Sequence, residues 1–258
     1  MITLLKNKNH FKLKKTMIFG IFKLDREMIK MKKIGFVVAI HRELQAVFNK
    51  YGEPKQEIKI PGYEIFVYEL FDKEIYIIHS GCGNIASSSA TQVLISLFNV
   101  EIIFNFGVVG GLDESLFVND VIIVEKVIHY DFDTSVIDLD MAKHQYDMFD
   151  SPYIETDKRL LELAKNINPN CKFVIDASGD HFVDSSEEKK LLHQEYGAGI
   201  CEMEAAGILI TCRRNNIPCL LIKAVSDDVN CGGADFKKNV SSAANKAVEL
   251  IFKIVEKM

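Results

Sequence analysis

Residues 199–207, Gly199-Ile200-Cys201-Glu202-Met203-Glu204-Ala205-Ala206-Gly207, join a short apolar run to an apolar helix and set two carboxylates and a methionine at the junction. Two further stretches have the same form, a strand with a buried pattern that ends in acidic residues: Ala177-Ser178-Gly179-Asp180-His181-Phe182 and Ile222-Lys223-Ala224-Val225-Ser226-Asp227-Asp228. Ligands of an open α/β sheet bind outside the carboxyl ends of its strands. The three stretches therefore predict the rim of one pocket.

Apolar runs without alternation continue on both sides of this rim and indicate strands that are buried on both faces. They occupy residues 34–40, 102–106, 121–127, 173–177 and 219–225, and residues 63–70 and 74–78 indicate two strands joined by a turn. Helical spacing is found directly after residue 40 and at about 85–98, 157–166, 184 onward, 204–215 and 236–256. The alternation predicts an α/β fold, a single domain with a mixed, largely parallel β-sheet flanked by helices.

Charge is distributed unevenly over the 258 residues. The net charge is −5, but residues 1–33 carry +8, which leaves −13 on the rest of the chain. An acidic body argues against nucleic acid as a partner. No apolar run approaches the length that spans a bilayer. The apolar segment 17–22 is too short for a signal peptide, and no small-residue cleavage site follows it. We expect a cytoplasmic protein without a membrane partner.

The start of the chain divides from the rest at Met31, because Met31-Lys32-Lys33 is followed at once by a strand. We expect residues 1–31 to be a basic N-terminal extension, either disordered or an artefact of an upstream start site, and residues 32–258 to form the one domain. A membrane-surface role for the extension is the less favoured alternative.

The cysteines indicate neither a disulfide framework nor a metal site. Most of the six lie in apolar runs, and no two form a C-x-x-C pair: Cys82, Cys171, Cys201, Cys212, Cys219 and Cys231. This usage is typical of reduced, buried thiols in a cytosolic protein. A zinc site requires paired Cys or His at short spacing, so we expect no metal and no cofactor.

Two glycine-rich turns and one long loop complete the chemistry-bearing segments. Ser80-Gly81-Cys82-Gly83-Asn84 lies between a strand and a helix, where it is either an anion cradle or a plain tight turn. In Gly107-Val108-Val109-Gly110-Gly111 the backbone turns sharply or another group lies against it. Residues 128–156 are irregular, and a loop of this length is usually functional or part of an interface.

Four motifs together resemble the nucleoside phosphorylase/hydrolase family in order and spacing: Ala39-Ile40-His41-Arg42-Glu43-Leu44, Ser178-Gly179-Asp180-His181-Phe182, Glu202-Met203-Glu204-Ala205 and Ala224-Val225-Ser226-Asp227. The most similar branch is the 5′-methylthioadenosine/S-adenosylhomocysteine nucleosidases, and the resemblance covers about residues 32–258. It implies a nucleoside phosphorylase-like fold. It also implies hydrolysis of the N-glycosidic bond of 5′-methylthioadenosine, S-adenosylhomocysteine or both, which releases adenine and the thioribose product.

The resemblance also implies a role for each site residue. Asp227, held by Ser226, would protonate the purine; Glu204 would bind the ribose hydroxyls; Glu43 would activate water. The substrate-binding positions would be Ile40, Cys82, Val109, Gly110, Phe182, Val183, Met203, Ser226 and Phe236. Cleavage passes through an oxocarbenium-like state, which needs an acid for the leaving base and carboxylates near the sugar. His41 and His181 lie at positions that vary in the family and receive no catalytic role.

The resemblance further favours water over phosphate as the nucleophile. Asn105 and Val108 stand where phosphorylases of the family hold phosphate with Arg and Ser, and neither can neutralise a phosphate dianion. Val108 also departs from the Ser, and Lys223 from the Arg, that nucleosidases often carry. The resemblance also implies a homodimer, because in this family the long loop helps to form the dimer.

Two alternatives stay open beside this hypothesis. The first is a hydrolase or phosphorylase of another purine nucleoside, such as adenosine, inosine or futalosine. The second is a non-catalytic nucleoside-binding protein on the same fold. Turnover of a nucleoside panel without phosphate discriminates among the three.

Overall fold

A computed structural model describes residues 31–230 and 232–258; the predicted basic extension, apart from Met31, lies outside the described residues. The strands are β1 (Lys32–Val38), β2 (Gln56–Ile60), β3 (Tyr63–Leu70), β4 (Lys73–His79), β5 (Ile102–Gly111), β6 (Val121–His129), β7 (Tyr153–Glu155), β8 (Lys172–Ser178), β9 (Ala198–Glu202) and β10 (Cys219–Asp227). The helices are α2 (His41–Tyr51), α3 (Asn84–Phe98), α4 (Lys158–Ile167), α5 (Ser186–Tyr196), α6 (Ala205–Arg214) and α7 (Gly233–Glu256). The α/β class and the mixed sheet are confirmed.

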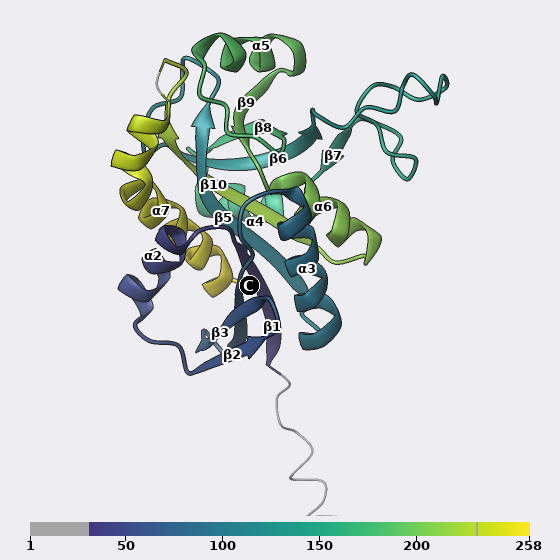
Figure 1. Ribbon diagram of the computed structural model, residues 1–258. Coiled ribbons are helices and arrows are strands. Elements are labelled where there is room, and N and C mark those ends of the chain that lie inside the picture. The colour runs from purple at the N-terminus through teal and green to yellow at the C-terminus, as the bar shows by residue number, and fades with distance from the viewer. Residues whose placement is uncertain (1–30, 231) are drawn as a thin grey trace, which may run out of the picture. The chain divides into compact units, whose positions relative to one another are not determined.

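The sheet closes on itself in one half (Figure 1). Its strand order is β10-β6-β8-β9-β5-β1-β4-β3-β2, with β7 on β6, and β10 also pairs with β5. Strands β5, β10, β6, β8 and β9 therefore form a closed five-stranded barrel, and β1, β4, β3 and β2 extend it as an open sheet.

The prediction of a largely parallel sheet was wrong. Within the described residues, five strand pairings are parallel and five are antiparallel. Strands β2, β3 and β4 follow one another through tight turns, which reverse direction. Strand β9 runs against β5, and the pair overlaps only at Gly110–Cys201 and Gly111–Ile200. A run of apolar residues shows that a strand is buried and does not show its direction.

Helices cover both faces of the sheet (Figure 1). Helices α2, α4 and α7 enclose one apolar core, in which the ring of Phe36 stacks on Phe104 at 5.3 Å and on Phe252 at 5.2 Å. Helices α3 and α6 enclose the second core on the opposite face. Burial of each such Phe side chain stabilises the fold by roughly 1.5–3 kcal/mol.

Helices α3 and α6 lie in close contact where both begin. A Cβ added to Gly207 would stand 2.2 Å from the carbonyl oxygen of Asn84, so only glycine permits this approach. The Asn84 side-chain oxygen accepts from the Gly207 N–H at 2.7 Å and from the Ser178 hydroxyl at 3.2 Å. One buried amide thus ties together the ends of β8, α3 and α6.

Candidate active site

One cavity, about 600 Å³ with its open mouth, lies where the ends of β1, β4, β8, β9 and β10 meet the C-terminal part of β5. All twelve residues that the sequence predicts as catalytic or substrate-binding line it, together with Ala39, Val108, His181, Cys201 and Glu202. The predicted rim therefore assembles, although β9 reaches it antiparallel to β5 and not along a common parallel edge. No Lys or Arg is among the described residues that line the cavity.

Glu43 lies in the first turn of α2 and is almost completely buried. Its two carboxyl oxygens accept backbone hydrogen bonds, Oε1 from Val108 N–H at 2.8 Å and Oε2 from Ile40 N–H at 3.1 Å. Gly107 permits this position, because a Cβ there would stand 2.6 Å from Oε1. Burial raises the pKa of Glu43, and the two N–H groups oppose that shift. The helix start and the glycine loop together fix this carboxyl group.

Glu204 precedes α6 and faces the glycine turn that follows β4. Its Oε1 accepts from the N–H of Gly83 at 3.0 Å, and its carbonyl oxygen accepts from the Ser87 hydroxyl at 3.0 Å. Burial, followed by the neighbouring Glu202 carboxylate, raises the pKa of Glu204 to about 8. Glu204 therefore exchanges its proton close to neutral pH.

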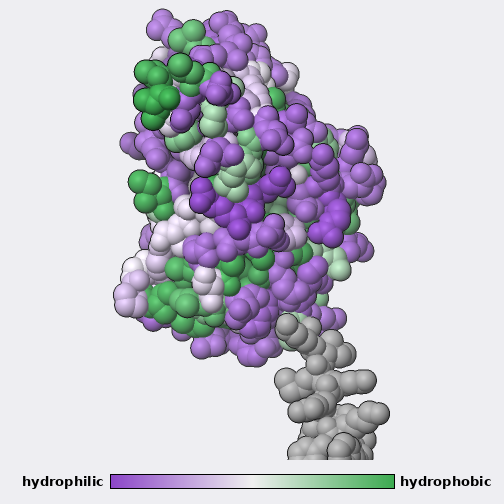
Figure 2. Space-filling model, turned by 90° about the vertical axis from the view of Figure 1, so that its right-hand side faces the viewer, coloured by the Kyte–Doolittle hydropathy of each residue, from purple (hydrophilic) through white to green (hydrophobic). Residues whose placement is uncertain are grey.

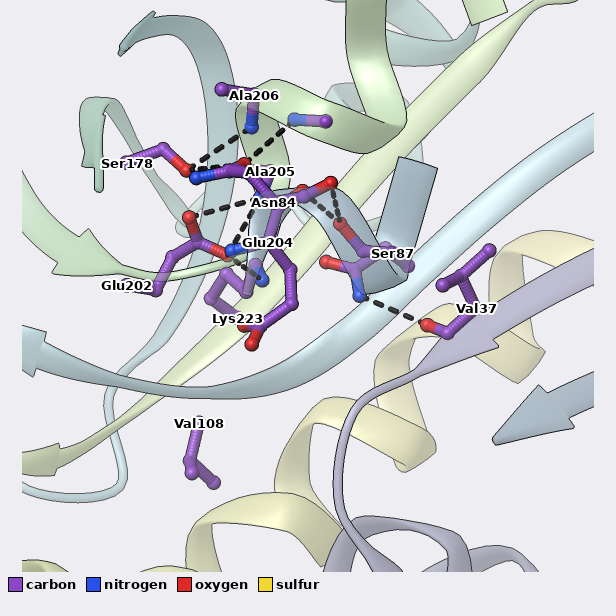
Figure 3. A network of polar contacts seen from close by, with 12 residues as sticks. Val37, Asn84, Ser87, Val108, Ser178, Glu202, Glu204, Ala205, Ala206 and Lys223 are labelled. Carbon is purple, nitrogen blue, oxygen red and sulfur yellow. Dashed lines mark hydrogen bonds and ion pairs between the residues drawn. The ribbon is translucent and has the colours of Figure 1, made fainter. Parts of the chain in front are cut away.

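Glu202 belongs to a buried network of polar contacts (Figure 3). Its Oε2 lies 2.8 Å from the Lys223 ammonium, and its oxygens accept the backbone N–H groups of Glu204 and Ala205 at 2.9–3.0 Å. Burial is the largest single effect and would raise the pKa of Glu202, but the charge and hydrogen bond of Lys223, together with the hydrogen bonds from Ala205 and Ser178, hold that pKa below the usual value. Glu202 thus fixes the backbone that carries Glu204.

Asp176 adds a third acid to this interior. It lies on β8, is fully buried, and neither carboxyl oxygen has a hydrogen-bond partner among the described residues. Burial, and then the charge of Glu202, raises its pKa well above the usual value, while Lys223 opposes the shift. The neutral form of Asp176 is therefore favoured by its surroundings, and the direct ion pair of Lys223 is with Glu202.

Asp227 closes β10 at the other side of the cavity and is almost completely buried. Its Oδ1 lies 2.7 Å from the Ser226 hydroxyl, which also lies 3.1 Å from the Val109 carbonyl oxygen. That hydroxyl has one proton. It can donate to an ionised Asp227, or donate to Val109 and accept the proton of a neutral Asp227. Burial raises the pKa of Asp227, against the effects of Lys189 and Ser226.

Apolar side chains form the remaining walls. Phe182 and Phe236 meet edge to face, with ring centroids 5.5 Å apart, and Phe182 is 45% exposed at the mouth. Val183 is buried behind them, and Ile40 and Met203 are half-buried. His181 also lines the cavity, where its Nε2 lies 2.6 Å from Glu188 at the surface. A flat aromatic wall beside buried acids suits a neutral planar base.

Sequence reasoning missed two buried groups of this region, Lys189 and Asp176. The lysine lies on α5 with its side chain completely buried, and its ammonium is 2.6 Å from Asp227 Oδ2. The segment Ser186–Lys190 of α5 is rich in charge and predicts an exposed helix start. The break in the apolar run of β8 at Asp176 was a visible signal of a buried acid.

Comparison with known proteins agrees with this geometry. The family model of the phosphorylase superfamily matches residues 33–258. The chain belongs to the phosphorylase superfamily. A 5′-methylthioadenosine/S-adenosylhomocysteine nucleosidase of Oceanobacillus iheyensis is 30% identical over 87% of this chain and 99% of its own. An aminodeoxyfutalosine nucleosidase of Helicobacter pylori is 28% identical over 88% of this chain and all of its own.

A solved superfamily structure shows the same fold with a ligand. It is the Helicobacter pylori 5′-methylthioadenosine/S-adenosylhomocysteine nucleosidase with butyl-thio-DADMe-Immucillin-A, which is 28% identical, has a TM-score of 0.83, and covers 89% of this chain and 100% of its own. The nucleoside phosphorylase-like fold and the family resemblance are confirmed.

No helix in residues 31–230 and 232–258 is both long and apolar enough to cross a membrane. The same residues bring together no group of three His, Cys, Asp or Glu side chains that would hold a metal ion.

Proposed function

We propose that this protein hydrolyses the N-glycosidic bond of 5′-methylthioadenosine, S-adenosylhomocysteine or both, and releases adenine and the thioribose product. The observation that carries the proposal is the convergence of Glu43, Glu204 and Asp227 on one cavity with apolar and aromatic walls. Relatives named 5′-methylthioadenosine/S-adenosylhomocysteine nucleosidase match 87–89% of the chain. The reaction needs three carboxyl groups with distinct tasks, and the cavity has them.

Asp227 is the proposed acid for the leaving group. Breaking the bond to the sugar places negative charge on the purine, which a proton on nitrogen 7 neutralises. Burial keeps Asp227 protonated above the pH range of an ordinary aspartic acid. The Ser226 hydroxyl contacts Asp227 in either protonation state, so it orients the acid before and after proton transfer.

Glu204 is the proposed ligand of the ribose hydroxyls. The sugar acquires positive charge as the bond breaks. That charge lowers the raised pKa of Glu204 and favours its carboxylate form, which in turn stabilises the charge on the sugar. Met203 lies beside Glu204 on the cavity wall and would pack against the sugar. The Gly83 N–H on Glu204 Oε1 leaves the second oxygen for the sugar.

Glu43 is the proposed base that holds and activates water. Its backbone contacts place it against Gly107 and Val108, the loop where an attacking group would enter. A phosphate dianion would meet the Glu43 carboxyl group there, with no lysine or arginine among the described lining residues to neutralise it. Asn105 is turned away, since its side-chain NH₂ donates to the Val37 carbonyl oxygen at 2.9 Å. These contacts favour water over phosphate.

The aromatic pair at the mouth is the proposed site of the base and the 5′ substituent. Phe182 would stack on adenine, the Val183 backbone would bind its edge, and Ile40 and Phe236 would line the alkylthio end. The second candidate function is cleavage of another purine nucleoside. The observation that favours this candidate is the likeness of the chain to the whole length of an aminodeoxyfutalosine nucleosidase. The substrates of the two candidate functions differ in the 5′ substituent.

A homodimer is part of the proposal. The segment 130–152 extends from the barrel beside β7 (Figure 1), and Val136, Ile137 and Leu139 in it are each at least 79% exposed. Apolar side chains also interrupt the hydrophilic surface on the side of the molecule shown in Figure 2. Exposed apolar side chains of this kind mark association surfaces. The predicted cytoplasmic location stays a prediction from the cysteine usage of the sequence.

A phosphate-free turnover assay over a panel of nucleosides tests the proposal. The panel contains 5′-methylthioadenosine, S-adenosylhomocysteine, aminodeoxyfutalosine, adenosine and inosine, and adenine or hypoxanthine release is measured. We expect adenine and a free reducing sugar from the two thioethers without phosphate. A sugar 1-phosphate formed only with phosphate would refute hydrolysis. Tight binding of 5′-methylthioadenosine without turnover would support the non-catalytic alternative.

A further inference from the structure

We propose that Lys189 is a positioning residue for the proton-transfer step: its buried ammonium group holds the Asp227 side chain and stabilises the carboxylate that remains after the proton has moved to the purine. This inference rests on the proposed function, since it concerns the acid of that reaction. Nothing in the sequence pattern of α5 indicates it.

Lys189 and Asp227 form a buried ion pair with short contacts. Lys189 Nζ lies 2.6 Å from Asp227 Oδ2 and 2.8 Å from the Asp228 carbonyl oxygen. Both side chains are shielded from solvent, at 0% and 1% exposure. Helix α5 is fixed at its start by Ser185, whose hydroxyl accepts from the Glu188 N–H. The lysine thus reaches the acid from outside the cavity, which it does not line.

Burial of an ammonium group is costly unless an anion and further hydrogen-bond acceptors compensate it. A lysine that only filled space would be replaced at lower cost by an apolar side chain of the same length. At Asp227 the lysine opposes the effect of burial, so the pKa of the acid rises less than burial alone would raise it. Among the described residues, Asp228, next in the chain, and Cys201 on β9 also interact electrostatically with Asp227.

In the proposed step, a proton moves from Asp227 to the purine. The Asp227 O–H bond breaks and its proton forms a bond to purine nitrogen 7, while the electron pair of the glycosidic bond moves to the purine. Lys189 keeps all its protons throughout, and its charge is paired with the new carboxylate. The oxygen of water then forms a bond to the sugar carbon, and the proton that this water loses passes to Glu43. Glu43 releases that proton to solvent, and solvent returns a proton to Asp227, so no net proton is consumed. Because the lysine favours the ionised acid, it lowers the barrier to proton donation.

The test compares the pH profiles of Lys189→Met, Lys189→Arg and the wild type on 5′-methylthioadenosine. An opposite charge at this distance shifts a carboxyl pKa by about 1–3 units. We expect Lys189→Met to move the alkaline limb of kcat upward by about 1–3 pH units and to lower the acidic plateau about ten- to a hundredfold. KM should stay within about twofold, since the lysine does not line the cavity. Lys189→Arg should keep the wild-type limb.

A matched control is Lys190→Met, which removes the exposed neighbouring charge on α5 and should leave the profile unchanged. In an Asp227→Asn background, Lys189→Met should cost no further activity, because the acid on which it acts is gone. A uniform loss of kcat at every pH without a shifted limb would reduce Lys189 to a structural role and overturn the inference.

A direct measurement keeps the inference testable if Lys189→Met does not fold. In the wild type, the chemical shift of Lys189 ¹⁵Nζ should change over the pH range in which the Asp227 carboxyl ¹³C resonance titrates, and Asp227→Asn identifies that resonance. A ¹⁵Nζ chemical shift that is insensitive to Asp227 ionisation would refute the proposal. Failure of the proposed function is distinct, since a wild type that is inert on every nucleoside would still show whether Lys189 ¹⁵Nζ responds to the ionisation of Asp227.

Discussion

The Lys223 ammonium group lies 2.8 Å from Glu202 Oε2 inside the five-stranded barrel, and each side chain is only 2% exposed. The same Glu202 carboxylate accepts the backbone N–H groups of Glu204 and Ala205. The ion pair therefore supports the backbone of the residue proposed to hold the ribose. Its removal should affect stability and the site together.

Replacing Lys223 should unfold the protein more easily. Lys223→Met leaves the Glu202 carboxylate buried without a cation, and loss of one partner of a buried pair costs about 3–5 kcal/mol. Urea unfolding measures this loss, and Lys223→Arg, which keeps the charge, should recover most of it. The matched control is Lys253→Met, which breaks the exposed pair with Glu249 and should cost less than about 1 kcal/mol. Equal costs for the two methionine variants would contradict the expectation.

Glu204 should make stability depend on pH. Its pKa is raised from 4.5 to about 8 in the folded protein, so the folded state binds the proton more tightly than the unfolded chain. This contribution to stability is fully present below pH 4.5 and is lost as the pH rises to about 8. Glu204→Gln should flatten the pH dependence of the unfolding free energy in that window. Glu57→Gln, on exposed β2, should leave it unchanged; an equal slope in all three proteins would contradict the buried-acid interpretation.

Asp227→Asn should abolish most of the turnover and keep the fold. Loss of a general acid lowers rates by about 10²–10⁴-fold, and the amide keeps the shape of the side chain. Turnover of 5′-methylthioadenosine measures the loss of activity, and the circular dichroism spectrum shows whether the fold is kept. Asp72→Asn is the control, because Asp72 lies in an exposed turn at φ 56°, which asparagine tolerates well. Near-normal turnover would exclude Asp227 as the acid.

Glu43→Gln should lose stability as well as activity. Both carboxyl oxygens accept backbone N–H groups, from Ile40 and Val108, so the glutamine NH₂ must face one of these donors. An unsatisfied buried donor costs about 1–3 kcal/mol. Thermal unfolding and kcat are measured beside Gln45→Ala, on the exposed side of α2. Unchanged stability would show that one backbone contact is not needed, and recovery of turnover by added phosphate would contradict the water assignment.

The residues of the site could be predicted from the sequence more completely than the strand directions of the sheet that carries them. Acidic residues after apolar strands identified the rim, because strand ends and helix starts are local features. The direction of each strand is not local. Strand β9 has five buried residues in an apolar run that would suit a parallel sheet, yet it meets β5 antiparallel at its tip. Closure of the barrel by β5 and β10 depends on pairing across more than a hundred residues.

Lys189 shows why the burial of a charged side chain cannot be predicted from its local sequence. Its neighbours Glu187, Glu188 and Lys190 are charged, and the local pattern is that of a solvated helix start. Only the approach of α5 to the end of β10 turns this one side chain inward. Asp176 differs, since a carboxyl group inside an apolar run already indicates an unusual environment.

Closure of the barrel limits local unfolding of the strands that line the cavity. Strand β10, which ends in Asp227, is hydrogen-bonded on both sides, to β5 and to β6, and β9 is likewise held by β5 and β8. Neither strand can peel away without breaking two ladders at once. Backbone amides in these strands therefore exchange with deuterium only when the whole domain opens. Asp227, the proposed acid, ends β10, and Glu204, the proposed ribose ligand, follows the end of β9 by two residues, so the spacing of the two should survive local fluctuations of the loops around them.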